Sequence, residues 1–179
     1  MAPKPYLAPI FFPPNPVHDP DVVVRPLAGY YQVREYTCGF ASTLMVLHAF
    51  HRRAHPQDVY QRLGTDHTGT RQTAIVRTLR HHGVGVNLRY DLGLDDLCQA
   101  IDDRKLVIAY HHNLEHWVVV YGYGRNPERI FVADPYWGTR SEHLWTHYGE
   151  KLNGFGMICS PRAGTRKARE SARQRAIAS

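Results

Sequence analysis

The chain has 179 residues, a length typical of one domain, and 43% of them are hydrophobic and 21% charged, as in ordinary globular proteins. The formal net charge is +6, but residues 162–179 hold six basic residues against one acidic residue, so the remaining chain is close to neutral. Because phosphate binding needs a basic groove, we do not expect a nucleic-acid partner. No apolar run approaches the roughly 18 residues that would suggest a membrane span, so no membrane-spanning helix is expected.

Composition divides the chain into three predicted segments. Residues 1–28 contain eight of the 12 prolines, and proline fixes φ and lacks a backbone donor, so this segment is expected to be an extended arm with a short edge strand at 22–24. Residues 29–161 form the folded domain. Residues 162–179 are predicted to be a solvated basic tail.

The first half of the folded domain is predicted to be mainly helical. Apolar spacing and the positions of proline and glycine indicate the following elements: helices at 38–50, 56–63 and from about Thr70 to His82, a strand at 84–90 and a helix at 95–104.

The second half is predicted to be a sheet. Strands are expected at 106–110, 117–123, 129–133 and 153–159. Glycines and Asn126-Pro127 form the turn between the second and third of these, and such short connections favour antiparallel pairing. The predicted fold class is α+β, with a helical part packed on an antiparallel sheet.

Three residues stand where these elements begin or end. Cys38 is at the first turn of an apolar helix, where the helix dipole and free backbone amides favour a thiolate. His116 precedes the strand that begins at Trp117, and Asp134 follows the next strand. A hairpin between these strands would make His116 and Asp134 neighbours. Cysteine nucleophiles need such a histidine base, and a carboxylate to orient it.

Gln32 lies six residues before Cys38-Gly39 and is the candidate oxyanion donor together with the Cys38 backbone N–H. These four features, in this order, resemble papain-like cysteine peptidases of the bacteriocin-processing type, which trim double-glycine leader peptides. The resemblance covers about residues 28–140 and includes His116-Trp117 with the following valines, and Asp134-Pro135 followed by Gly138. It implies a papain-like fold with Cys38 as nucleophile, His116 as base, Asp134 as orienting residue and Gln32 as oxyanion donor.

The resemblance leaves the substrate open. Family members are often fused to a transporter, and this sequence has no membrane segment; it also has Thr37 where members often have aspartate. A stand-alone peptidase or amidohydrolase is expected first. The alternatives are an acyltransferase or amide-forming enzyme that uses the same Cys38 thioester, and a peptide-binding module without catalysis. The expected substrate is a peptide, an amide or a carrier-bound acyl group, without a cofactor.

Other chemistry-bearing residues receive weaker interpretations. Gly39, Trp117 and Trp137 are candidate substrate-binding residues, and Trp137 can also shield the histidine–aspartate pair. His143 and His147 have the spacing of two metal ligands on a helix, but no acid or cysteine accompanies them, so no metal is expected. Cys98 and Cys159 lie in apolar segments and are expected to be structural. An odd number of distant cysteines and the lack of a secretory signal indicate the cytoplasm.

Overall fold

The computed structural model describes residues 10–11, 19–137 and 139–161. The helices and strands of the helical half are β1 (Ile10–Phe11), β2 (Val22–Val24), β3 (Ala28–Gly29), α1 (Cys38–Ala49), α2 (Pro56–Leu63), α3 (Gln72–His81) and β4 (Val84–Arg89). The sheet half contains α4 (Leu94–Asp102), β5 (Leu106–His111), a 3₁₀ turn (His112–Leu114), β6 (His116–Arg125), β7 (Glu128–Asp134), β8 (Thr139–Leu144), α5 (Trp145–Leu152) and β9 (Gly156–Pro161).

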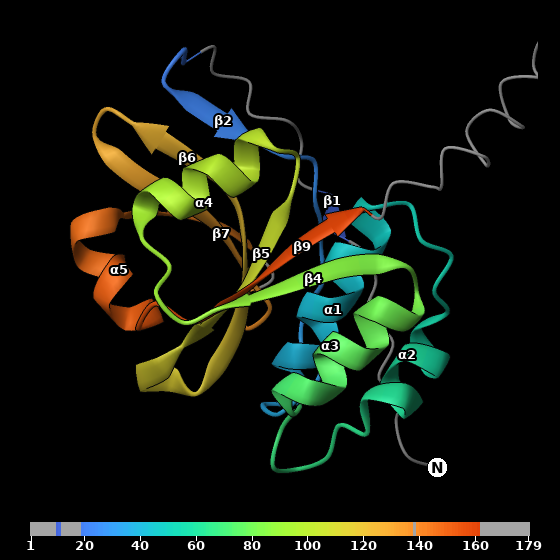
Figure 1. Ribbon diagram of the computed structural model, residues 1–179. Helices are drawn as coiled ribbons and strands as arrows, with labels where there is room; N and C mark the ends of the chain where they lie inside the picture. Colours follow the sequence, from blue (N-terminus) through green and yellow to red (C-terminus); the bar gives the residue numbers. More distant parts are fainter. Residues whose placement is uncertain (1–9, 12–18, 138, 162–179) are drawn as a thin grey trace, which may run out of the picture.

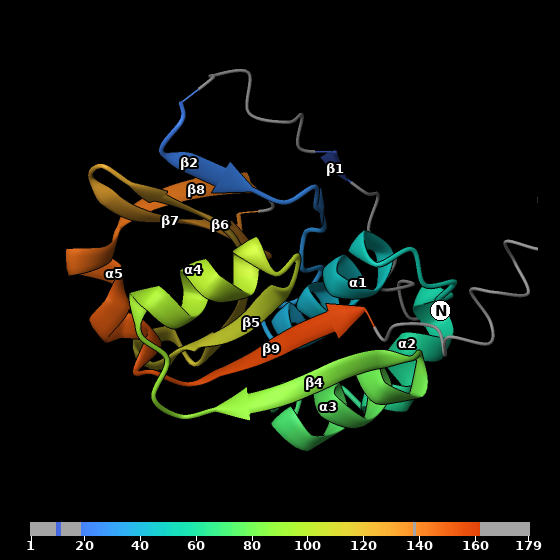
Figure 2. The ribbon, with the colours of Figure 1, turned by 45° about the horizontal axis from the view of Figure 1, so that its top comes forward.

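The main sheet has seven strands and is antiparallel throughout. Its strand order is β4-β9-β5-β6-β7-β8, and β2 pairs with the C-terminal part of β6. The helices α1, α2 and α3 gather on one side of this sheet, and α4 and α5 lie on the other (Figures 1 and 2). The predicted α+β class and the antiparallel pairing are confirmed.

Both faces of the central strands are covered, which explains their continuous apolar sequences. Successive residues of β6 point in opposite directions, so Val119 packs in the core on the α1 side while Val118 and Val120 pack in the core that includes α5. The first ten residues of α1 are buried. Helix α1 is therefore a central element of the core and not a surface helix, as its apolar sequence predicts.

The structure corrects the prediction in three places. β8 and α5 lie between 134 and 153, where the sequence predicts no element, because its mixed polar residues give no clear period. β9 begins at Gly156, since Asn153 and Gly154 have positive φ and make a turn first. His143 lies in β8 and His147 in α5, so the two do not share a helix face.

The predicted arm is partly described. β2 confirms the strand expected at 22–24, where it lies beside Gly122–Gly124 of β6. Gly122 permits this approach, because a Cβ there would lie 2.6 Å from a Val24 methyl group. The predicted tail, 162–179, lies outside the described residues. No helix in the described ranges is both long enough and apolar enough to cross a membrane.

Candidate active site

Cys38 is the first residue of α1, and the start of this helix is uncapped by any side chain of the described structure. Thr37 occupies the capping position, but its hydroxyl donates to the Arg34 carbonyl at 2.9 Å and accepts from the Arg34 N–H at 3.2 Å. The hydroxyl thus closes the preceding turn and leaves the helix start open. The first N–H groups of a helix have no partner within it, so they remain available to an anion beside Cys38.

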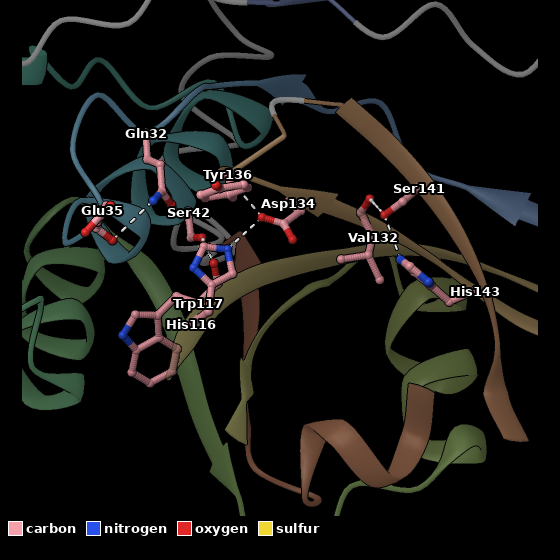
Figure 3. Close-up of polar contacts among 10 residues, drawn as sticks. All are labelled: Gln32, Glu35, Ser42, His116, Trp117, Val132, Asp134, Tyr136, Ser141 and His143. Atoms are coloured by element: carbon pink, nitrogen blue, oxygen red, sulfur yellow. Dashed lines mark hydrogen bonds and ion pairs between the residues drawn. The ribbon is translucent and has the colours of Figure 1, made fainter. Parts of the chain in front are cut away.

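His116 is the first residue of β6, and Asp134 is the last residue of β7. Antiparallel pairing brings these two ends together, and His116 Nε2 lies 2.6 Å from Asp134 Oδ1 (Figure 3). Both side chains are well covered, with 9% and 13% of their surfaces exposed. The backbone N–H of Tyr136 donates to the same carboxylate oxygen at 2.8 Å and fixes its position. The predicted hairpin geometry is confirmed.

The start of α1 packs directly on the start of β6, which places Cys38 beside His116. Ser42 donates from Oγ to the Trp117 carbonyl at 3.1 Å, and the Trp117 indole donates to the Thr70 carbonyl at 3.1 Å. Gly39 packs against Thr70 and Trp117: a Cβ on Gly39 would be 2.6 Å from the Thr70 side chain and 3.0 Å from Trp117. Glycine is thus required for the close approach of helix and strand.

The electrostatic state of His116 follows from its surroundings. Burial alone lowers the pKa of His116, but hydrogen bonds with Asp134 and Cys38, and the negative charges of both, outweigh it and raise this pKa to about 9. The ring is therefore an imidazolium at neutral pH. An imidazolium held between a carboxylate and a cysteine is the arrangement that makes a thiolate available for attack.

Gln32 lies on the same side of the cleft as Asp134. Its backbone N–H donates to the Pro135 carbonyl at 2.8 Å, and its side-chain Nε2 donates to the Glu35 carbonyl at 3.1 Å (Figure 3). The side-chain amide nitrogen of Gln32 carries two hydrogens. The hydrogen bond to Glu35 uses one of them and orients the amide, so the second N–H can donate to a substrate oxygen. The backbone hydrogen bond from Gln32 to Pro135 attaches the loop before α1 to the chain that follows β7.

Two adjoining cavities open at the site. The first, of about 570 Å³, is lined by Cys38 and by Trp117. The second, of about 390 Å³, is lined by Gln32, His116, Asp134 and Trp137. Gly39 lines neither of these two cavities, so its predicted role in binding stays a prediction beside its packing role.

Several lining residues had not been selected from the sequence. Glu35 and Leu114 line both cavities, and the loop from His67 to Thr70 lines the first. Glu35 lies within the segment between Gln32 and Cys38, which is a usable signal. The 67–70 loop contains only common polar residues and glycine, and nothing in the sequence shows that it faces Cys38.

The histidines outside the site form no metal centre in the described part of the chain, where no group of three or more histidine, cysteine, aspartate or glutamate side chains lies close enough to hold an ion. His143 stacks on the ring of Tyr148, with centroids 4.1 Å apart. Its Nε2 lies 2.9 Å from the Ser141 hydroxyl.

Comparison with known proteins gives one family match and several structural matches. The model of the Peptidase C39 family matches residues 28–147. A double-glycine-motif protease from an AMS/PCAT transporter, solved in complex with the leader peptide, has a TM-score of 0.63 and 18% identity, over 78% of this chain and 94% of that one. The peptidase domain of Streptococcus ComA, a bifunctional ABC transporter in a quorum-sensing pathway, has a TM-score of 0.59 and 16% identity, over 73% and 96%. No curated protein matches significantly. The structural matches confirm the predicted papain-like fold.

Proposed function

Since this chain belongs to the peptidase C39 family, and is thus a cysteine peptidase, we propose that it cleaves an amide bond through Cys38, His116 and Asp134. Residues 29–161 form the catalytic domain in this proposal. The observation that carries it is the His116–Asp134 pair, 2.6 Å apart, at the open start of α1 where Cys38 stands. The resemblance stated from the sequence and the family match agree on the class of enzyme.

In the first step, the thiolate sulfur of Cys38 attacks the carbonyl carbon of the scissile bond. The carbonyl oxygen becomes an oxyanion, and His116 then gives its proton to the departing nitrogen as the C–N bond breaks. An amine leaves, and the acyl group remains on Cys38 as a thioester. Asp134 stabilises the imidazolium and holds the ring toward Cys38.

The oxyanion needs donors that are already in place. The uncapped start of α1 supplies the Cys38 backbone N–H, and the Gln32 amide supplies the second donor. In the second step, water attacks the thioester carbon and gives a proton to His116. The C–S bond breaks, the acid is released, and the thiolate–imidazolium pair is restored.

The substrate we infer is a peptide. The PCAT protease of similar fold was solved with its leader peptide and acts on a double-glycine motif, so a peptide that contains Gly-Gly is the first probe. A reducing compartment such as the cytoplasm, which the three free cysteines favour, would keep the thiolate available.

Acyl transfer is the second candidate. The cavity of about 390 Å³ beside His116 has room for an acceptor larger than water, and a peptidase would use the same room for the leaving amine. The chemistry up to the thioester is the same. The two candidates differ only in which nucleophile takes the acyl group from Cys38.

The test uses the full chain with a library of Gly-Gly peptides and, separately, iodoacetamide. We expect hydrolysis that is lost in Cys38→Ala and kept in Cys98→Ala, with iodoacetamide labelling Cys38 at least about 100-fold faster than Cys98. A thioester that turns over only with an added amine would select acyl transfer. Equal labelling of both cysteines, without hydrolysis, would leave a binding module and overturn both enzymatic candidates.

A further inference from the structure

The two cavities at the site differ in which reacting group they contain. The cavity of about 570 Å³ includes Cys38 but not His116 among its lining residues, and the cavity of about 390 Å³ includes His116 but not Cys38. Glu35 and Leu114 line both and mark the boundary between them. A substrate that reaches both reacting groups therefore has one part in each cavity.

The chemistry assigns the two parts. Cys38 forms its bond to the acyl carbon, whereas His116 hands a proton to the departing nitrogen. The acyl side of the scissile bond thus belongs in the first cavity and the leaving-group side in the second. This assignment rests on the proposed function.

The wall of the second cavity includes three large apolar side chains that are exposed to solvent. Leu114, Tyr136 and Trp137 all line it, and 65%, 57% and 63% of their surfaces are exposed. The rings of Tyr136 and Trp137 meet edge to face, with centroids 5.0 Å apart and planes at 81°. Two rings at right angles form a corner into which a third ring can pack.

The backbone that carries the corner is tied to the site by two hydrogen bonds. The Tyr136 N–H is tied to Asp134 at 2.8 Å, and the Pro135 carbonyl accepts from the Gln32 N–H at 2.8 Å. Figure 3 shows Tyr136 above His116 and beside Asp134. Both hydrogen bonds go to residues of the proposed catalytic machinery, so the backbone of Pro135 and Tyr136 is anchored beside the reacting groups.

The charge of this cavity is also one-sided. Glu35 and Asp134 line it, and the charge of Asp134 is balanced by its ion pair with His116. None of the described lining residues is lysine or arginine. An acidic side chain placed here would meet the Glu35 carboxylate without a compensating cation.

We propose that the cavity formed by Gln32, Glu35, Leu114, His116, Tyr136 and Trp137 binds the residue that directly follows the scissile bond, and that it selects an aromatic, non-acidic side chain. The same cavity receives the amine when the thioester is attacked in the reverse sense. In that step, the amine nitrogen bonds to the thioester carbon, the C–S bond breaks, and the amine proton passes to His116. An acceptor amine thus reports on this subsite independently of the acyl side.

The experiment measures how the acyl-enzyme divides between amines and water. The acyl donor is the p-nitrophenyl ester of N-acetyl-glycyl-glycine, and the acceptors are alaninamide, phenylalaninamide and aspartic acid α-amide at equal concentrations of free amine. After the enzyme-free reaction of the ester is subtracted, the ratio of aminolysis to hydrolysis is independent of the amount of active enzyme, so partial misfolding of a variant does not affect it.

We expect phenylalaninamide to exceed alaninamide about tenfold in this ratio and the aspartate amide to fall below alaninamide. Trp137→Ala should reduce the phenylalanine preference to about twofold, and Trp137→Phe should restore most of it. The matched control is Tyr90→Ala, an equally exposed aromatic outside the described cavities, which should keep the tenfold preference.

The outcomes separate the two proposals. Equal ratios for the three amines, or a preference unchanged by Trp137→Ala, overturn the subsite while an acyl-Cys38 adduct in the mass spectrum upholds the thiol chemistry. Failure to form any adduct on Cys38 overturns the proposed function and the subsite with it.

Discussion

Cys38 and Cys159 are both buried and both free, but their surroundings differ. Cys159 lies in the middle of β9, between β4 and β5, where burial raises its pKa to about 12 and its Sγ donates to the Met157 carbonyl at 3.3 Å. Cys38 begins a helix, lines a cavity and contacts a histidine whose pKa is raised to about 9.

At Cys159, burial penalises the thiolate and no neighbouring positive charge among the described residues offsets that penalty, so the thiol stays protonated and unreactive. Cys38 differs from Cys159 in having His116 beside it and in standing at the open start of a helix.

The largest effect is expected from the sulfur itself. Cys38→Ala should lower kcat/KM for a Gly-Gly peptide by about 10⁴-fold or more, because no thioester can form. Cys159→Ala should keep the activity and lose only some stability, since it leaves a small gap in the core. Activity that survives in Cys38→Ala would show that Cys38 is not the nucleophile.

The next effect concerns the oxyanion. Gln32→Ala should lower kcat by about 10²–10³-fold with little change in KM, because the donor acts mainly in the transition state. Steady-state kinetics checks this, with thermal unfolding as the control for the Gln32–Glu35 hydrogen bond. A rise in KM at constant kcat would instead assign Gln32 to substrate binding.

Asp134→Asn should act through the charge of His116. Removing the carboxylate lowers the pKa of His116 from about 9 toward 6.5. Activity needs the imidazolium, so the alkaline limb of the pH profile should move from near 9 to lower pH, with a loss of roughly 30-fold at pH 8. An alkaline limb that stays near 9 in the variant would exclude Asp134 as the cause.

The same pair should affect folding. The pKa of His116 is higher in the folded chain, so its contribution to stability is complete below about pH 6.5 and is lost as pH rises through about 9. Urea unfolding of the wild type should show this decline in the free energy of unfolding. In Asp134→Asn, the decline between pH 6.5 and 9 should be much smaller.

The smallest effect is expected at the contact between helix and strand. Gly39→Ala places a methyl group 2.6 Å from the Thr70 side chain, which should cost ~1–2 kcal/mol of stability after the gain in helix propensity. Gly93→Ala is the matched control, because its Cβ would lie 3.8 Å from the Asp96 carboxylate, an ordinary contact distance for a side chain. Equal unfolding midpoints for the two variants would contradict the close-packing argument.

Much of the fold was accessible from the sequence, because the patterns involved are local. The apolar run after Cys38 predicts a buried helix, and Pro56 and Gly64 bound the next one. His116 and Asp134 were paired from the hairpin between them, whose turn residues are distinctive. These signals need no knowledge of distant parts of the chain.

The missing parts depend on distant contacts. β8 has a polar sequence and is stabilised by its pairing with β7 at the sheet edge. The division of the cleft into two cavities depends on where Leu114 and the 67–70 loop come to lie. Trp137 is a candidate substrate-binding residue in the sequence and lines the second cavity, but its exposure of 63% depends on contacts that no local pattern reports.

The place of β9 in the sheet has a consequence for how the chain acquires its structure. β9 pairs on one side with β4, whose residues precede it by about 70 positions, and on the other with β5. In the finished sheet β9 lies between β4 and β5. Until residues 156–161 have left the ribosome, β4 and the α3 helix that packs on it therefore cannot be joined to β5 through the sheet. Completion of the sheet therefore waits for the last strand, and long-range pairing of this kind is slow to form.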